Sequence, residues 1–422
     1  MCACRAGIEL KTNLLCAGKN LERSNWLDLQ RRAIFEFCKW DIHSEDHDVL
    51  ASFPLFLEQQ TAEHLNRLAE RLAQETIAAE AEILQNPKLL KTLGLPRSIR
   101  KILQQDARVQ QGCAHLRVMR FDFHPTDAGW KISEVNSDVP GGFIEASGWN
   151  KLYGEQWTSV NEPLSTSDIY ADAIHRIVGN GGIVGLVHAT NFSDDRQVMQ
   201  QLARCVAKRG VKVALLGPAH LRWVDGLAEM STDFASGRPD LVVRFFPAEW
   251  LPHAGSDSCW KAYFQPTKIP LSNPGSAIAS QTKRFPLIWN ELRTNLATWQ
   301  DLLPHTCEVE EVQSPLDDSW VLKPALGRVG EGIAIRGISS ASDFRQRERQ
   351  ARRRPEEWVA QKRFAISPVN TESGIRYPCI GVFTIDGKAA GFYGRVSQHP
   401  IITHQAQDAA VLVTKRGEVN AA

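Results

Sequence analysis

The chain has 422 residues, 43% of them hydrophobic, and its 49 Lys and Arg nearly balance its 48 Asp and Glu. This composition excludes intrinsic disorder, which requires low hydrophobicity or a high net charge. It also gives no electrostatic footprint for non-specific nucleic-acid binding, and no apolar run reaches the ~18 residues of a membrane helix. The length predicts two or three domains at about 150 residues each.

The N-terminus and the cysteines predict a cytoplasmic protein. Glu9 and Lys11 interrupt any apolar core of a secretory signal. The nine cysteines are odd in number and widely spaced, as is typical of a reducing compartment. Cys2 and Cys4 could bind a metal or react, but two thiols cannot complete a tetrahedral site, which favours a frayed terminus.

Residues 1–110 are expected to be mainly helical. Leu65, Leu68 and Leu72 recur at helical spacing, and the proline that follows Asn86 should end their helix. No chemistry is visible in this part of the chain, and we interpret it as a structural scaffold.

A β-hairpin is predicted next. Two segments with alternating apolar and polar residues, 115–123 and 130–136, flank a turn cluster at 124–129. A segment rich in glycine and proline follows at 139–142. The hairpin is the first part of the sequence that suggests a functional site.

Four polar side chains of this hairpin should meet on one face. Side chains two positions apart on a strand point the same way, so Arg120 accompanies Asp122, and Glu134 accompanies Asn136. A tight turn then brings two carboxylates, an amide and a guanidinium together. Oxygen ligands of this kind suit Mg²⁺, and an arginine suits phosphate. The alternative is a solvated sheet face with a surface ion pair.

Residues 180–250 predict strand–helix–strand units and therefore a parallel sheet. The expected strands lie at 182–187, 211–216 and 240–246, and the expected helix at 194–209. Residues 251–282 are rich in Pro, Ser and Gly, which predicts a connector.

A second α/β-like region begins near residue 301. Its predicted strands lie at 320–323, 333–336, 358–361, 379–384 and 389–394. The helix at 343–354 is crowded with arginines, which predicts a solvated face and assigns it no role.

Two single residues are weaker candidates for a functional site. Lys283 could contact a phosphate and Arg395 could place a guanidinium in a cleft, although each alone is more typical of a surface.

The loop after the predicted strand 320–323 is a candidate phosphate site. The strand ends in Lys323, and the loop carries Gly327, Gly330 and Gly332. Glycines let backbone N–H groups surround a phosphate, and the lysine adds positive charge. The spacing matches neither a Walker A loop nor a dinucleotide fingerprint. An ordinary glycine-rich hairpin turn explains the pattern about equally well.

Taken together, these segments resemble the synthetase domain of glutathionylspermidine synthase, a family of the ATP-grasp superfamily. The resemblance covers residues 20–415 and rests on Arg120-Phe-Asp122, Glu134-Val-Asn136, Asn273-Pro-Gly, Lys283, Val321-Leu-Lys-Pro324, Gly327-Arg-Val-Gly-Glu-Gly332, Trp358-Val-Ala-Gln361, Ile380-Gly-Val-Phe and Gly391-Phe-Tyr-Gly-Arg395. The carboxylates precede the Lys–Gly loop, which is the reverse of ordinary ATP-grasp enzymes. This order is the circular permutation of the branch.

The resemblance implies an α/β (α+β) fold. It would be a circularly permuted ATP-grasp fold with a Rossmann-like preATP-grasp subdomain and a helical N-terminal part. The chain would divide into the helical part at 1–110, the metal-site hairpin and glycine-rich segment at 111–175, the α/β substrate-side subdomain at 176–282 and the nucleotide-binding lobe at 283–422.

The resemblance also implies an ATP-dependent, ADP-forming ligase. It would join a small-molecule or peptide carboxylate to an amine through an acyl-phosphate, with ATP and two Mg²⁺ ions and without a nucleic-acid or membrane partner. Asp122, Glu134 and Asn136 would hold the metal. Arg120 would stabilise the transferring phosphoryl group and the tetrahedral adduct. The ATP contacts would come from Lys283, Lys323, Gly327, Arg328, Gly330, Gly332, Gln361 and Arg395.

Two other functions stay open for such a fold: a non-catalytic ATP-binding protein and an ATP-dependent kinase. The substrates stay open as well. Glutathione-using members carry small hydroxyl residues after the Glu-x-Asn pair, whereas this chain has Ser137-Asp-Val-Pro-Gly-Gly142. Asp138 in this stretch could bind an amine or cap a turn. The oligomeric state does not follow from the sequence.

Overall fold

The computed structural model describes residues 15–44, 47–106, 113–233, 235–255, 258–328 and 330–415. Cys2 and Cys4, for which the sequence suggested a metal site or a frayed terminus, lie outside these ranges. Within the described ranges, no helix has both the length and the apolar character needed to cross a lipid bilayer.

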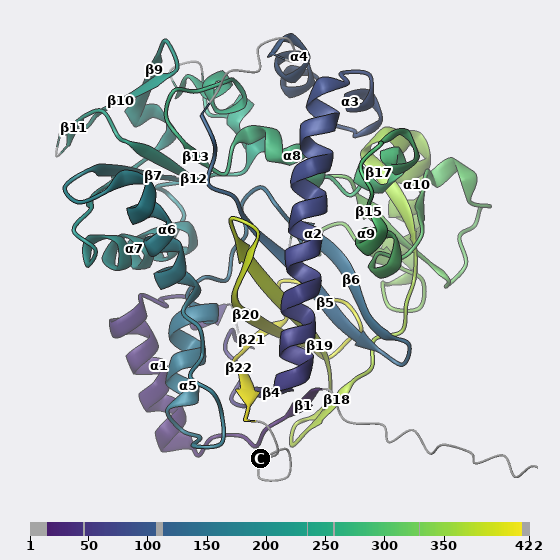
Figure 1. Cartoon of the computed structure of the whole chain (residues 1–422). Helices are drawn as coiled ribbons and strands as arrows, with labels where there is room; N and C mark the ends of the chain where they lie inside the picture. Colours follow the sequence, from purple (N-terminus) through teal and green to yellow (C-terminus); the bar gives the residue numbers. More distant parts are fainter. Residues whose placement is uncertain are drawn as a thin grey trace, which may run out of the picture.

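A six-stranded antiparallel sheet lies at the centre of the molecule (Figure 1). Its order is β21-β20-β19-β5-β6, and the short β18 pairs with β19. The strands are β5 (Val118–Thr126), β6 (Gly129–Asn136), β18 (Val369–Thr371), β19 (Gly374–Ile385), β20 (Lys388–Ser397) and β21 (Gln407–Ala409). The predicted hairpin is confirmed as β5 and β6.

The long helix α2 (Gln59–Gln85) crosses this sheet and packs against β5, β19 and β20 (Figure 1). Leu65 and Leu72 are fully buried, because residues at helical spacing share the face that meets the sheet. The helix ends before Asn86, as predicted. The buried Glu80 near its end accepts a 2.8 Å bond from Nη2 of Arg117, which anchors the helix beside the start of β5.

A second sheet is entirely parallel, with the order β13-β12-β7-β8, as the strand–helix–strand pattern predicted. Its strands and nearby elements are β7 (Ile183–His188), β8 (Lys212–Leu216), β12 (Leu241–Phe245), β13 (Leu271–Ser272), α6 (Thr166–Val178), α7 (Ser193–Ala207) and the small sheet of β9 (Leu221–Val224), β10 (Leu227–Ser231) and β11 (Ser236–Gly237).

The prediction of a plain connector over 251–282 is wrong in part. This segment supplies the edge strand β13, the helix α8 (Ile278–Gln281) and several short 3-10 turns. A parallel edge strand of two residues is too short to leave a periodic signal in the sequence.

The third sheet, with the order β14-β17-β15-β16, forms a separate lobe beside the central sheet. Its elements are β14 (Thr306–Cys307), β15 (Trp320–Pro324), β16 (Ala334–Ile335), β17 (Trp358–Lys362) and α10 (Ala341–Arg353). The preceding helix α9 (Ala297–Leu302) packs instead against α2 and β6. Helix α10 buries Phe344 and Ala351 in the core of this lobe. Arg345, Arg349 and Arg353 lie exposed on its outer side, as expected for a solvated face.

The N-terminal elements pack against later parts of the chain. Strand β4 lies between β1 and β22 and pairs in parallel with β22. The elements are β1 (Leu15–Ala17), α1 (Arg23–Phe37), β2 (His43–Ser44), β3 (His47–Asp48), β4 (Leu55–Glu58), α3 (Leu89–Thr92), α4 (Arg97–Asp106), α5 (Asn150–Gly154) and β22 (Val411–Thr414). The four-part division of the chain stays a prediction.

We expect Leu72→Ala to lower the free energy of unfolding by about 2–5 kcal/mol, because it opens a cavity between α2 and the central sheet. The matched control is Ile77→Ala on the same helix, where the side chain is 38% exposed. It should change the free energy by about 0.5 kcal/mol or less. Urea denaturation of both variants measures the difference, and equal effects would contradict the packing described.

Candidate active site

Three neighbouring strands bring polar side chains to one face of the central sheet. Asp122 on β5 lies opposite Glu134 on β6 and opposite Gly381 on β19. Arg120 lies opposite Asn136. Partners across an antiparallel pair share a face. The predicted meeting of the two polar pairs is therefore confirmed.

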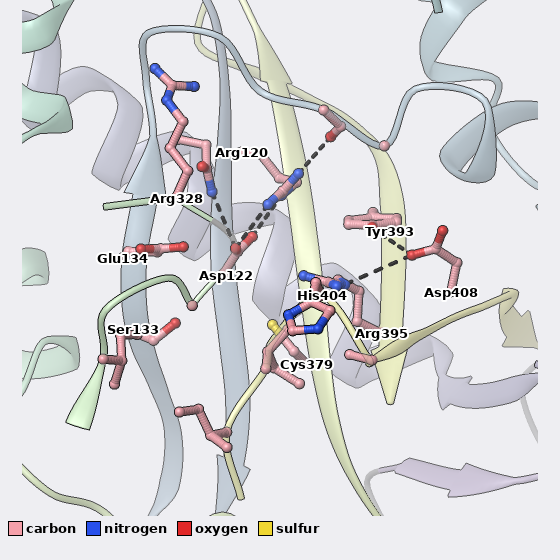
Figure 2. A pocket seen from close by; sticks show the side chains of 18 of the residues that line it. Arg120, Asp122, Ser133, Glu134, Arg328, Cys379, Tyr393, Arg395, His404 and Asp408 are labelled. Atoms are coloured by element: carbon pink, nitrogen blue, oxygen red, sulfur yellow. Dashed lines mark hydrogen bonds and ion pairs between the residues drawn. The ribbon is translucent and has the colours of Figure 1, made fainter. Parts of the chain in front are cut away.

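A cavity of about 690 Å³ lies over this face (Figure 2). Most of the residues that the sequence singled out line it, namely Arg120, Asp122, Glu134, Asn136, Lys323, Arg328, Gly330, Gln361 and Arg395. Gly327 and Gly332 belong to the same loop as Gly330. Lys283 lies behind Glu134 and donates a 2.6 Å bond to the carbonyl oxygen of Gly327. Segments far apart in the sequence thus converge on one cavity.

The guanidinium of Arg120 is held along its edges and on one face. Its Nε and Nη2 donate to the two carboxylate oxygens of Asp122 at 2.7 and 3.0 Å, and its Nη1 donates to the Gly141 carbonyl at 2.5 Å. The guanidinium carbon lies 4.8 Å from the centre of the Tyr393 ring. A Cβ at position 381 would lie 2.7 Å from Cδ of Arg120, so Gly381 makes room for this arginine.

Two lysines from outside the hairpin reach Glu134. Nζ of Lys283 lies 3.0 Å from Oε2 of Glu134, and Nζ of Lys323 donates to the Ser133 carbonyl at 3.0 Å. Burial alone would raise the pKa of Glu134, but Lys283 and Lys323 lower it to about 2. Burial lowers the pKa of Lys323 to about 8, against the opposing effect of Glu134. The cavity therefore holds an ionised carboxylate, Glu134, beside a lysine, Lys323, whose pKa is about 8.

The donor set of the hairpin fits a magnesium site. Asp122 and Glu134 offer carboxylate oxygens from adjacent strands, and Asn136 directs its Nδ2 to Asp122 Oδ2 at 3.1 Å. Among the residues that the structure describes, none donates a hydrogen bond to the amide oxygen of Asn136. No group of three or more His, Cys, Asp and Glu suited to a metal occurs among the described residues. A Mg²⁺ ion bound by two carboxylates completes its shell with an amide, water or substrate oxygens.

The glycine loop is packed against two other segments. Gly330 has a φ of +71°, and a Cβ there would lie 2.3 Å from the Ile402 carbonyl oxygen. Arg328, predicted to contact phosphate, instead pairs with carboxylates in this structure. Its Nε and Nη2 donate to Glu249 at 2.7 and 3.0 Å, and Nη2 also donates to Asp138 at 3.1 Å. A phosphate contact from Arg328 stays a prediction.

Asp138 neither caps a turn nor offers a free carboxylate to an amine. Its side chain is fully buried and accepts bonds from Nη2 of Arg244 at 2.5 Å and from the Ala248 backbone N–H at 2.9 Å. Its Oδ2, which accepts from Ala248, also accepts from Arg328, so Asp138 joins the glycine-rich segment, the strand β12 that carries Arg244, and the glycine loop. Asp138 therefore has a structural role, in place of the amine binding or turn capping that the sequence suggested.

The end of the cavity beside the third sheet is more apolar. Gln361, predicted near an adenine, is buried and donates from Nε2 to Thr306 Oγ1 at 2.9 Å. Burial lowers the pKa of His124 to about 4, so its ring is neutral and bonds Ser133 Oγ. Five apolar residues that the sequence interpretation missed also line this end: Val321, Ile333, Ile335, Phe364 and Ile366. Ile333 and Ile335 could have been found by their spacing of two.

The opposite wall is formed by β20 and β21. Arg395, predicted at the phosphate end, donates from Nη2 to the Thr403 carbonyl at 2.8 Å, and its Nε lies 3.8 Å from Asp408. The hydroxyl of Tyr393 donates to Asp408 at 2.6 Å (Figure 2). The sequence interpretation missed Tyr393, although it precedes Arg395 by two positions on one strand and so shares its face.

Known proteins resemble this chain in sequence and in fold. The family described as glutathionylspermidine synthase preATP-grasp matches residues 19–413. A glutathione synthetase-like effector from Globodera pallida, solved in its apo form, is 13% identical with a TM-score of 0.61 over 93% of this chain and 96% of that chain, which shows a shared fold. A putative gamma-glutamylcysteine synthetase from Methylobacillus flagellatus KT is 14% identical over 79% of this chain and 88% of that chain, with a TM-score of 0.43. No curated protein matches the sequence.

The pKa of Lys323 provides a test of the site's electrostatics. In ¹³C-lysine NMR, its Cε resonance should titrate with a midpoint near pH 8. Glu134→Gln should lower that midpoint, because it removes the charge that favours the ammonium, whereas Lys283→Gln should raise it, because it removes a repelling charge. Lys323→Arg assigns the resonance. Shifts of equal sign in the two variants would contradict the arrangement.

Proposed function

The chain belongs to the glutathionylspermidine synthase preATP-grasp family, which matches residues 19–413, and from this premise we propose that it is an ATP-dependent carboxylate–amine ligase. The observation that carries the proposal is the pairing across one cavity of the Asp122 and Glu134 carboxylates with Arg120, Lys283 and Lys323. Such a cavity suits a reaction that transfers a charged phosphoryl group.

The apolar end of the cavity would hold the nucleotide base. It lies between the third sheet and the β5–β6 hairpin, with Gln361 beside it and Phe364 5.5 Å from the His124 ring. The triphosphate would extend from there toward Lys323 and Lys283, under the glycine loop. Backbone N–H groups of a glycine-rich loop and lysine side chains are suited to binding phosphate oxygens.

Asp122, Glu134 and Asn136 would hold the magnesium ions. These ions, when bound, neutralise phosphate charge and help align the reacting oxygens. Asp122 and Glu134 are already paired with Arg120 and Lys283, so the metal would share these carboxylates with two cations, and the phosphates of ATP would balance the added positive charge.

The reaction would run in two balanced steps. A carboxylate oxygen of the first substrate attacks the terminal phosphorus of ATP, ADP leaves, and an acyl-phosphate forms. The nitrogen of the amine then attacks the acyl carbon, phosphate leaves, and the nitrogen loses a proton to give the amide. Arg120 would stabilise the negative charge that develops in both steps. The glycine loop, packed on Ile402, would exclude water that otherwise hydrolyses the acyl-phosphate.

The amine would enter from the end of the cavity away from the third sheet. Three further carboxylates, Asp41, Asp194 and Asp195, line the cavity, and Asp41 pairs with Nζ of Lys39 at 3.0 Å. Burial, with the nearby Asp194, raises the pKa of Asp195 to about 6, so it is mostly ionised at pH 7. Carboxylates in this position favour a cationic co-substrate over an anionic one.

The test is ADP release with MgATP and a panel of carboxylates, with and without amines. Release that requires both partners, with a product mass equal to their sum minus water, would support the ligase. Release with a carboxylate alone would indicate acyl-phosphate formation, and a phosphorylated product that forms equally with and without amines would indicate a kinase. Binding of MgATP without any release across the panel would favour a non-catalytic protein, and absence of MgATP binding would contradict the proposal.

Substitutions should distinguish residues that act in the reaction from residues outside the site. We expect Asp122→Asn and Lys323→Met to lower the rate of ADP release by about 100-fold or more, since each removes a charge from the transition state. The matched control is Lys388→Met, whose side chain is 78% exposed on β20. It should leave the rate unchanged. Full activity of either site variant would overturn the assigned roles.

A further inference from the structure

We propose that Tyr393 is a positioning residue for Arg120, and that Lys39 sets the position of Tyr393 through Asp408. The inference rests on the proposed function, in which Arg120 stabilises the transferring phosphoryl group. It adds a series of contacts that supports Arg120. The series begins in the N-terminal part of the sequence, where the sequence analysis found no chemistry. Figure 2 shows Arg120, Tyr393 and Asp408 following one another across the sheet face.

Arg120 needs support that does not depend on Asp122 when a metal binds. Asp122 engages two nitrogens of the guanidinium. Magnesium bound to Asp122 would compete with that pair for the carboxylate. The contacts that do not involve Asp122 are the Gly141 carbonyl, the Tyr393 ring, whose centre lies 4.8 Å from the guanidinium carbon, and the more distant Phe383 ring at 6.0 Å. Tyr393 is the closer of the two rings and would keep the guanidinium in place when the metal is bound.

Two glycines show that this stack is closely fitted. A Cβ at position 381 would lie 2.7 Å from Cδ of Arg120, beneath the path by which the arginine reaches the ring. A Cβ at position 142 would lie 3.0 Å from atoms of the Tyr393 ring, on a backbone with φ of +93°. Neither position accommodates a side chain without moving the arginine or the tyrosine.

The ring in turn is fixed by its hydroxyl. Tyr393 donates to Oδ1 of Asp408 at 2.6 Å, and Nζ of Lys39 lies 3.3 Å from Oδ2 of the same carboxylate. Burial, reinforced by Asp408, raises the pKa of Tyr393 well above its usual range, so the phenol keeps the proton that it donates. Asp408 thus connects a neutral donor with a buried cation.

Lys39 is buried and paired, so it can fix the position of Asp408. Its side chain is 2% exposed and also pairs with Asp41 at 3.0 Å and with Glu145. Cys38, in the left-handed conformation at φ 59°, ends α1 and turns the chain so that Lys39 points inward. Three carboxylates around one ammonium raise the pKa of Lys39 despite its burial, so its charge is constant.

The test uses a phosphoryl-transfer analogue, because its binding reports on Arg120 without a known acceptor. Calorimetry gives the affinity for MgADP with and without aluminium fluoride, and the ratio of the two should reach about 100-fold in the wild-type protein. Arg120→Ala should abolish this enhancement. Tyr393→Leu should reduce it about tenfold, and Tyr393→Phe and Lys39→Met about threefold. The affinity for MgADP alone should not change in the Tyr393 and Lys39 variants.

The matched control is Tyr153→Phe. It removes a buried hydroxyl that donates to the Ala51 carbonyl at 3.0 Å, away from the cavity. It should lower stability and leave the enhancement unchanged. If Lys39→Met does not fold because three carboxylates lose their cation, the Tyr393 variants decide the matter.

The outcomes separate this inference from the proposed function. An enhancement that is lost in Arg120→Ala but kept in Tyr393→Leu overturns the inference and leaves the ligase standing. A wild-type protein that binds MgADP without any enhancement also overturns it. A wild-type protein that binds neither MgADP nor MgATP refutes the proposed function itself.

Discussion

Opposite charges that face each other in a partly buried cavity are the constraint on which the rest of the structure depends. Asp122 and Glu134 lie side by side, and two carboxylates in such a place repel unless a cation reaches each of them. Arg120 supplies one cation from the strand that carries Asp122, whereas Lys283, behind Glu134, and Lys323, on β15, come from outside the hairpin. The packing of the two lobes is therefore tied to the charge balance between them.

Half of the site could be predicted because its geometry is local. Alternation along a strand put Arg120 beside Asp122, and a tight turn put that pair against Glu134 and Asn136. Lys323 and its glycine loop were visible for the same reason, since a strand end and three glycines form a short pattern. The patterns alone did not predict that the hairpin and the glycine loop lie at the same cavity. That link came from the resemblance to a known family.

The other half depends on partners that are distant in the sequence. Nothing in the sequence around Arg328 indicates that its carboxylates are Glu249 and Asp138. The N-terminal part was interpreted as scaffold, yet it supplies Lys39, which is buried behind the cavity wall and pairs with Asp408 in that wall. The whole fold determines which carboxylates surround a buried cation. A sequence pattern predicts only contacts between residues that are close along the chain.

The separation of these partners has a consequence for the order of assembly. Lys39 and Asp408 bond across 369 positions, and β4 pairs with β22 near the other end of the described chain. Contacts of such long range form slowly, after local hairpins and helices. During synthesis on the ribosome, the β5–β6 hairpin is therefore complete early, and the cavity wall that contains Asp408 is complete last. Partial translation products contain the reactive groups without the support that orients them.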